Sequence, residues 1–246
     1  MIELFNGDCL DVMDELIMNG VKVDAIITDP PFGVTKNKID QVIPFDEMWK
    51  RLKKLRKDDT PIILFGQGLF FYKLVLSNEK EYRYDIVWDK QLTSGFLNAK
   101  RMPLRQHEQI AVFYKRLPVY NPQFTKGKPL HSKGVNYKNK EIKNQNYGKF
   151  NHTDDNRKGS TDKYPTSIVR FQKPHPSKAI HPTEKSLELM EWLVKTYTNE
   201  NDLVLDFTAG SFTTGVACKR LNRSFIGIEL EEEYYKIGKE RIKKGE

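Results

Sequence analysis

The sequence predicts an α/β protein with a mostly parallel sheet that is flanked by helices. Two observations predict it: short apolar, β-branched runs of strand length recur along the chain, and helical patterns separate most of them. Strands that alternate with helices form parallel sheets, and such sheets bind ligands at the carboxyl ends of their strands. With 246 residues, the chain is long enough for one domain with a real core and an insertion.

Seven runs have the length and composition of strands. They lie near residues 2–5, 23–28, 61–65, 84–88, 109–114, 203–206 and 224–228. Helical patterns lie near residues 9–19, 45–57, 67–78, 183–197, 212–220 and 230–243. Thr183 and Glu184 suit the start of the helix over 183–197. Because no helical pattern separates 84–88 from 109–114, we expect these two strands to pair antiparallel at the edge of the sheet.

The positive charge of the chain is concentrated in one segment. The formal net charge is +8, and the stretch from Lys115 to Lys178 holds 15 Lys and Arg against 4 Asp and Glu, a net of +11 that leaves −3 for the rest. Residues 116–176 also break the alternation and are rich in Asn, Lys, Gly, Pro and Tyr. One interpretation is a disordered insertion. The other is an insertion that reads nucleic acid, with Lys and Arg on phosphates, Asn and Gln on base edges, and Tyr stacked on bases.

The cysteines, the apolar runs and the N-terminus indicate the cellular compartment of the protein. Two cysteines, Cys9 and Cys218, allow neither a disulfide framework nor CxxC metal spacing, and the histidines of the insertion show no ligand spacing. No apolar run approaches the roughly 18 residues of a membrane span. The N-terminus lacks the layout of a signal peptide. We therefore expect a cytoplasmic protein without a metal site.

A candidate catalytic motif follows the second predicted strand. Asp29-Pro30-Pro31-Phe32 puts a carboxylate, a rigid turn and an aromatic ring at the end of that strand. Asp29 can accept an N–H from the exocyclic amine of a base and supply negative charge beside it. Pro30 has no N–H, so a carbonyl of the turn can point at the second amine hydrogen, and Pro31 stiffens the turn. Phe32 offers a flat face on which an extruded base can stack.

A candidate cofactor motif follows the sixth predicted strand. That strand ends in Asp206, and a turn of small residues leads into a helix, where a nucleotide-like cofactor can rest on backbone amides. Glu229 ends the next strand, where a carboxylate can accept hydrogen bonds from both ribose hydroxyls. Asp8 is expected at the adenine amine of the cofactor, and residues 181–185 at its carboxylate. The expected cofactor residues are Asp8, Cys9, Asp29, His181, Thr183, Lys185, Asp206, Phe207, Thr208, Ala209, Gly210, Ser211, Phe212, Thr213 and Glu229.

Basic residues in two segments are candidate DNA contacts. Lys36 and Lys38 follow the catalytic motif, either in a solvated loop or in a flap that contacts DNA where the base enters. The candidates of both segments are Lys36, Lys38, Lys126, Lys128, Lys133, Lys138, Lys140, Arg157 and Lys158. We interpret His107 and Glu108 as structural hydrogen-bonding residues, and Trp88 as a core residue.

With these motifs the chain resembles the permuted β group of DNA amino-methyltransferases, the adenine-N6 and cytosine-N4 family. The matching segments are Gly7-Asp8-Cys9-Leu10, Asp29-Pro30-Pro31-Phe32, Val87-Trp88-Asp89-Lys90, Arg105-Gln106-His107-Glu108, His181-Pro182-Thr183-Glu184-Lys185, Leu203-Val204-Leu205-Asp206 and Phe225-Ile226-Gly227-Ile228-Glu229. The resemblance implies a seven-stranded, Rossmann-like methyltransferase sheet with circularly permuted motif order. It implies a catalytic half over 1–115, an inserted target-recognition segment over 116–176 and a cofactor-binding half over 177–246.

The resemblance also implies S-adenosylmethionine as methyl donor and DNA as substrate, with a homodimer and a companion restriction endonuclease as further partners. Adenine N6 is the implied position, because Asp rather than Ser at the first catalytic position is more typical of adenine-N6 enzymes. A cytosine-N4 enzyme, an RNA or single-strand methyltransferase and a catalytically silent DNA-binding protein stay open as alternatives.

Phe212 departs from the family pattern, which often has a glycine at this place in the segment over 206–214. We call this segment the cofactor loop. If the position needs a positive φ, Phe is strained there. If the position needs only close approach, the ring packs aside or narrows the pocket. The silent DNA-binding alternative depends on this residue.

Overall fold

The computed structural model describes residues 1–34, 40–129, 159–175, 177, 180 and 184–245. Two compact units are present: Met1–Asn121 with Thr166–Glu246, and Pro122–Pro165. The larger unit contains a sheet with the strand order β1-β10-β9-β2-β3-β5-β4-β8. In the smaller unit, β6 (Thr125–Lys126) and β7 (Asp162–Lys163) pair antiparallel.

All seven predicted strands are present in the large sheet. β5 runs antiparallel to both of its neighbours, β3 and β4, and the other pairs are parallel. The pairing of β4 with β5 is the antiparallel pair expected for residues 84–88 and 109–114. The bounds are β1 (Ile2–Asn6), β2 (Ala25–Thr28), β3 (Ile62–Gly66), β4 (Tyr82–Ser94), β5 (Arg105–Phe113), β9 (Leu203–Asp206) and β10 (Ser224–Glu229).

The sheet has an eighth strand that the sequence did not predict. β8 (Ile168–Arg170) pairs in parallel with β4, so β8 and not β4 lies at this edge of the sheet. Its three residues are too few for a strand pattern to stand out. The end of the segment expected as an insertion therefore belongs to the main sheet.

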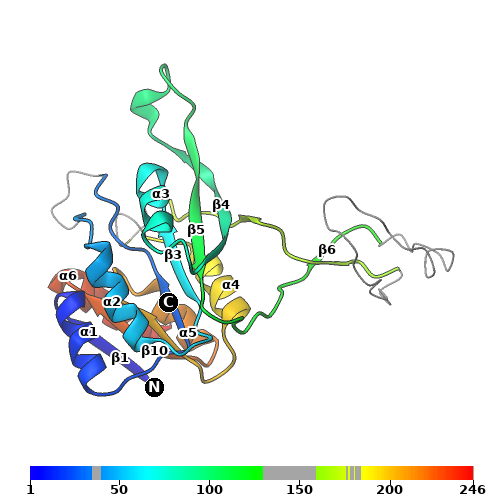
Figure 1. Ribbon diagram of the computed structural model, residues 1–246. Coiled ribbons are helices and arrows are strands. Elements are labelled where there is room, and N and C mark those ends of the chain that lie inside the picture. Colours follow the sequence, from blue (N-terminus) through cyan, green and yellow to red (C-terminus); the bar gives the residue numbers. More distant parts are fainter. Residues whose placement is uncertain (35–39, 130–158, 176, 178–179, 181–183, 246) are drawn as a thin grey trace. The chain divides into compact units, whose positions relative to one another are not determined.

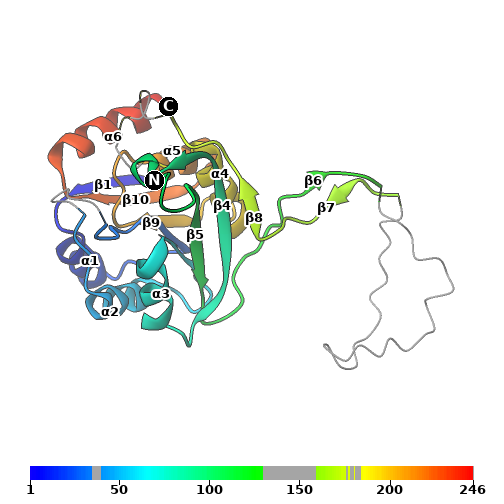
Figure 2. The same ribbon diagram turned by 90° about the horizontal axis from the view of Figure 1, so that it is seen from above.

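Helices cover both faces of the large sheet (Figures 1 and 2). One face packs against α1 (Cys9–Met18), α2 (Phe45–Leu55) and α3 (Gly68–Ser77), and the other against α4 (Leu187–Tyr197), α5 (Thr213–Arg220) and α6 (Glu232–Lys244). The predicted start of α4 at Thr183 and Glu184 is wrong, because Ser186 is the N-cap. Among the described residues, no helix combines the length and the apolar character that crossing a bilayer requires.

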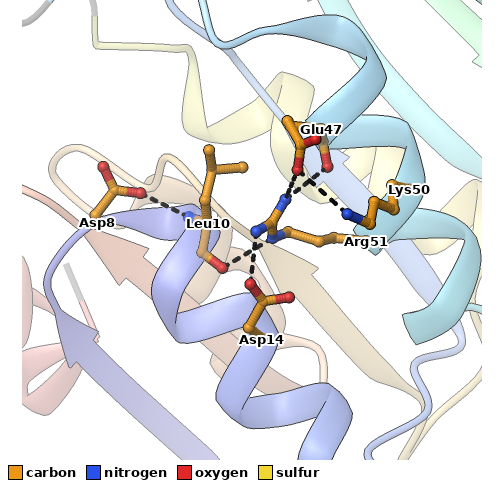
Figure 3. A network of polar contacts seen from close by, with 6 residues as sticks. All are labelled: Asp8, Leu10, Asp14, Glu47, Lys50 and Arg51. Carbon is orange, nitrogen blue, oxygen red and sulfur yellow. Dashed lines mark hydrogen bonds and ion pairs between the residues drawn. The ribbon is translucent and has the colours of Figure 1, made fainter.

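A polar network holds the start of α1 against α2 (Figure 3). Asp8 caps α1 by accepting a hydrogen bond from Leu10 N at 2.8 Å. Arg51 of α2 donates to Leu10 O at 3.1 Å and pairs with Asp14 at 2.5 Å and with Glu47 at 2.6 Å. Because both helices hold this first turn, the Asp8 carboxylate is fixed just beyond the carboxyl end of β1.

The strands that carry the two predicted motifs are neighbours. β2 and β9 pair in parallel although they are far apart in the sequence. The buried hydroxyl of Thr28 joins their ends, since it donates to Asp206 Oδ1 at 3.0 Å and accepts from Phe207 N at 3.1 Å. Asp29 and the cofactor loop therefore leave the same edge of the sheet side by side.

Candidate active site

A cavity of about 650 Å³ lies at the carboxyl edge of the large sheet. Residues 29–32 and 206–211 line it together with Asp8, Cys9, Lys185, Thr213 and Glu229. The cavity thus brings together the predicted catalytic and cofactor residues that the structure describes, with the exception of Phe212. His181 and Thr183 lie outside the described residues.

The two carboxylate oxygens of Asp29 have different surroundings. Oδ2 pairs with Lys185 Nζ at 2.8 Å. Oδ1 is buried and has no hydrogen-bond partner among the described residues. Burial raises the pKa of Asp29 from 3.8 to about 6, although the Lys185 ammonium acts in the opposite direction. A buried acceptor without a partner is costly, so Oδ1 is an open binding position for a donor.

Lys185 is the centre of a chain of charged groups in the cavity wall. Its ammonium also pairs with Glu108 Oε2 of β5 at 2.9 Å, and Lys90 Nζ of β4 pairs with Glu108 Oε1 at 3.2 Å. Burial favours a higher pKa for Glu108, but the two ammonium groups lower it to about 2. Burial opposes the charge of Lys185, yet the carboxylates of Asp29 and Glu108 raise its pKa above the ordinary value. Glu108 and Lys185 are therefore both ionised at neutral pH.

The sequence does not predict this group of charges. It predicts Lys185 at the cofactor and Glu108 as a structural hydrogen-bonding residue. A signal was present on β4, where Ile86, Trp88 and Lys90 are buried at every second position. A lysine on the inward face of a strand needs a buried carboxylate as partner. Trp88 itself is a core residue, as predicted, and is fully buried.

Phe32 forms a wall of the cavity beside Asp29. Its ring lies 4.9 Å from the ring of Phe70, at an interplanar angle of 35°. The carboxylate of Asp40 fixes the turn that follows, because it accepts hydrogen bonds from the backbone N–H groups of residues 33 and 34 at 2.8 and 2.9 Å. Packing on one side and this turn on the other hold the Phe32 ring in place.

Two buried carboxylates shape the cofactor loop. Asp206 accepts a hydrogen bond from Thr214 Oγ1 at 2.6 Å, and burial raises the pKa of Asp206 to about 7. Glu229 accepts from Gly210 N at 2.7 Å and from Glu231 N at 2.9 Å. Asp206 Oδ2 and both oxygens of Glu229 each accept one of these hydrogen bonds and can accept another. Both residues line the cavity, so they are available to a ligand that carries hydroxyl groups.

Arg241 of α6 holds the cofactor loop in place through hydrogen bonds that the sequence does not predict. Its guanidinium donates to Ser211 O and Oγ at 2.8 Å and to Thr213 Oγ1 at 3.2 Å, and pairs with Glu184 Oε1 at 2.8 Å. It therefore ties the loop to the segment that precedes α4. Nothing in the sequence distinguishes this arginine from the other basic residues in the last turn of α6.

Phe212 faces away from the cavity. Its backbone is left-handed, with φ 58° and ψ 33°, a region that costs a non-glycine residue roughly 1 kcal/mol. The ring is fully buried in space that two glycines leave free: a Cβ on Gly227 would lie 2.5 Å from Phe212 Cε1, and a Cβ on Gly238 would collide with Cδ2. The position thus has the positive φ considered above, and its ring packs aside without narrowing the cavity.

Two of the predicted DNA contacts lie in the described part of the smaller unit, where Lys126 and Lys128 are both exposed. Lys126 pairs with Asp162 across β6 and β7. The other predicted contacts, which are Lys36, Lys38, Lys133, Lys138, Lys140, Arg157 and Lys158, lie outside the described residues. Their contact with DNA stays a prediction.

Comparison with known proteins agrees with the motifs. Residues 23–240 match the N6/N4 methyltransferase family, which is described as DNA methylase. The Type II methyltransferase M1.MboII of Moraxella bovis is 28% identical over 250 residues, which cover 92% of this chain and 91% of that protein. M2.LlaDCHI of Lactococcus lactis subsp. cremoris is 52% identical, but only over 65 residues, which are 26% of this chain and 24% of that protein.

Solved structures share the fold. The M1.HpyAVI–SAM complex has a TM-score of 0.66 at 29% identity and covers 98% of this chain and 100% of its own. The PvuII DNA methyltransferase, which is cytosine-N4-specific, has a TM-score of 0.66 at 15% identity over 100% and 93% of the two chains, so its likeness concerns the fold alone. The resemblance inferred from the motifs is confirmed: the chain belongs to the N6/N4 family of DNA methylases.

Proposed function

We propose that this chain transfers a methyl group from S-adenosylmethionine to N6 of an adenine that is flipped out of duplex DNA. The observation that carries the proposal is Asp29 Oδ1, a buried acceptor without a described partner in the cavity wall. An exocyclic amine supplies the donor that this oxygen lacks. The aspartate at this position, where serine is the alternative, supports adenine over cytosine.

The residues of the cavity fit S-adenosylmethionine. Asp8 and Glu229 offer carboxylates to its adenine amine and ribose hydroxyls, and the small residues at 208–211 allow close approach to the backbone. Phe212 leaves this space free because its ring lies on the other side of the loop. The bound cofactor supplies an electrophilic methyl group on a sulfonium centre.

Asp29 acts on the amine in this proposal. Its Oδ1 accepts one N–H, which orients the nitrogen lone pair toward the methyl group. The nitrogen gains positive charge as its new bond forms, and the neighbouring carboxylate stabilises this charge and then accepts the proton that the nitrogen loses. With a pKa of about 6, Asp29 is mostly ionised at neutral pH and is still basic enough for this role.

Lys185 and Phe32 position the reacting groups. Lys185 holds Asp29 Oδ2, so that Oδ1 is the oxygen left for the amine. Its positive charge also keeps the buried carboxylate ionised. Phe32 presents a fixed ring in the same wall, on which a flipped base can stack.

We also propose that residues 1–115 and 177–246 are the catalytic and cofactor-binding halves, and that 116–176 contains the target-recognition segment. Its concentration of Lys and Arg supports contact with a polyanion. A homodimer and a companion endonuclease belong to the same proposal as expected partners.

The test is methyl transfer from labelled S-adenosylmethionine to duplex DNA of mixed sequence, followed by digestion and identification of the methylated nucleoside. We expect N6-methyladenine. N4-methylcytosine would assign the cytosine reaction instead, and label only in RNA or single strands would change the substrate. Salt-sensitive DNA binding without measurable cofactor binding would identify a silent DNA-binding protein.

Asp29→Ala and the isosteric Asp29→Asn are the matched variants for this assay. Both lack the anionic carboxylate, so we expect both to lose turnover while their circular dichroism and unfolding transition stay close to wild type. Retained turnover in either variant, with the nucleoside product unchanged, would remove the carboxylate from the mechanism.

A further inference from the structure

The hairpin formed by the end of β4 and the start of β5 extends away from the large sheet. We call residues 91–107 the arm. Figure 1 shows the arm reaching past α3, with its tip free of other elements of the larger unit. The arm starts at the cavity, because Leu92, Thr93 and Ser94 line the cavity next to the catalytic residues.

The tip of the arm is locally ordered. Gly95 turns the chain with a left-handed backbone, at φ 84° and ψ 31°. Backbone hydrogen bonds then run from Asn98 N to Gly95 O at 2.9 Å, from Ala99 N to Phe96 O at 3.1 Å and from Arg101 N to Asn98 O at 2.8 Å. The tip therefore satisfies its own backbone groups and holds a defined turn without support from the sheet.

This tip presents large apolar side chains to solvent. The exposed fractions are 77% for Phe96, 82% for Leu97 and 55% for Met102. Every residue from Thr93 to His107 is exposed. Neighbouring apolar residues at the end of a projecting element, outside any core, indicate a surface that is buried against a partner.

The charge of the arm identifies the class of partner. Lys100, Arg101 and Arg105 are exposed, and no Asp or Glu lies between Asp89 and Glu108. A basic surface with an apolar tip complements duplex DNA, whose phosphates surround stacked apolar bases. A second copy of the chain is the rival occupant, but a symmetric contact between two such arms brings like charges together.

We propose that the arm inserts Phe96 and Leu97 into the base stack of duplex DNA beside the target base, while Lys100 and Arg101 hold the flanking phosphates. This inference rests on the proposed function, because a base that enters the cavity must leave the duplex. Apolar side chains that fill the vacated stack favour the extruded state. The position of the arm at the rim of the cavity places the wedge next to the opening that it serves.

The test compares the wild type with a tip variant, Phe96→Ser with Leu97→Ser. Both proteins are assayed on two unmethylated DNA duplexes that contain a site that the wild type methylates. In one duplex the target base is paired, and in the other it is mismatched, so that its extrusion costs less. We expect kcat/KM of the tip variant to fall at least tenfold on the paired duplex and less than threefold on the mismatched one. Equal activity of the variant and the wild type on the paired duplex would overturn the wedge.

A matched control replaces two exposed apolar residues near the ends of α1 and α3 that do not line the cavity. Met18 and Leu76 have exposed fractions of 78% and 69%. Met18→Ser with Leu76→Ser should keep wild-type kcat/KM on both duplexes. A loss in this control equal to that of the tip variant would mean that apolar surface anywhere has the effect, and would refute the specific role of the tip.

A second variant tests the phosphate contacts. Lys100→Gln with Arg101→Gln should weaken duplex binding in fluorescence anisotropy and reduce the slope of log Kd against log salt by about two. An unchanged slope would refute these contacts. The paired and mismatched duplexes should lose affinity alike, because phosphates do not report base pairing.

Two further readouts separate this inference from its rivals. If the arm joins two copies, light scattering will show a dimer for the wild type and a monomer for the tip variant, and the mismatch will not rescue activity; that result would overturn the DNA wedge. If the wild type methylates no DNA, the proposed function fails, and the affinity for duplex DNA alone tests the wedge. We expect the tip variant to bind duplex DNA about fivefold more weakly than the wild type. Equal affinity of the two proteins would refute the wedge.

Discussion

Gly238→Ala should have opposite effects on stability depending on the residue at position 212. In the wild type the new Cβ collides with the buried ring of Phe212, a residue whose exposed fraction is 0%. Overpacking of this kind costs about 1–3 kcal/mol, and we expect about 3 kcal/mol because a rigid ring in a filled site has no room to move. The cost should appear as a lower free energy of unfolding.

In a Phe212→Gly background the same substitution should stabilise the protein. Removal of a buried phenyl ring costs about 3–5 kcal/mol, of which relief of the left-handed strain returns about 1 kcal/mol. The single variant is then about 2–4 kcal/mol less stable than the wild type. Gly238→Ala no longer collides and gains about 1 kcal/mol in helix propensity inside α6. Because this gain applies in both backgrounds, it cancels, and the coupling energy between the two sites is the overpacking cost of about 3 kcal/mol.

Urea unfolding of the four proteins, followed by circular dichroism, measures this coupling. A cost of Gly238→Ala that is equal in both backgrounds would refute the placement of the ring.

Activity supplies an independent check. Because the ring lies outside the cavity, Phe212→Gly should not raise kcat, and a large gain would show that the ring obstructs the cofactor.

Three further predictions concern the buried carboxylates. Lys185→Met removes the cation that lowers the pKa of Asp29, so the acid limb of the profile of kcat against pH should move above its wild-type position near pH 6. Lys185→Arg keeps the cation and should keep this position. Superimposable profiles for wild type and Lys185→Met would contradict this role. Glu229→Ala should weaken S-adenosylmethionine binding at least tenfold in calorimetry, since it removes a charged acceptor for two hydroxyls, and an unchanged Kd would exclude that contact. In the folded protein the pKa of Asp206 is about 7, above its ordinary 3.8, so this carboxyl favours folding most below pH 4 and loses this contribution as pH rises to 7. The free energy of unfolding of Asp206→Asn, relative to wild type, should therefore improve over that interval. A difference that does not depend on pH would refute the raised pKa.

The strands that build the site could be predicted from the sequence because each signal is local. β2 and β9 are buried runs of apolar residues that end in an aspartate or lead directly into one, and the small-residue turn after Asp206 stands out by composition. Such patterns need no knowledge of the partner strand. β8 lacks a local signal, since its three residues gain their strand structure only by pairing with β4.

The polar contacts of the site could not be predicted because they depend on distant partners. Thr183 and Glu184 have the form of a helix start, but Glu184 pairs with Arg241 and the helix begins later. Glu108 looks like a residue of an edge strand until the pairing of β4 with β5 sets it beside Lys90, and the fold brings Lys185 from 77 positions away. The sequence shows which charged residues exist, but the strand register and the packing of the fold show which of them form ion pairs.

The pairing of β2 with β9 has a consequence for how the enzyme is made. Thr28 and Asp206 are 178 positions apart, so a ribosome completes β2 long before it makes β9, the strand that pairs with it. Until then β2 lacks the neighbour that covers one of its edges, and Asp29 has no cofactor loop next to it. A nascent or truncated chain that ends before β9 therefore carries the proposed catalytic motif without the loop proposed to bind the cofactor, and we expect methylation activity to arise only after β9 and this loop have been made.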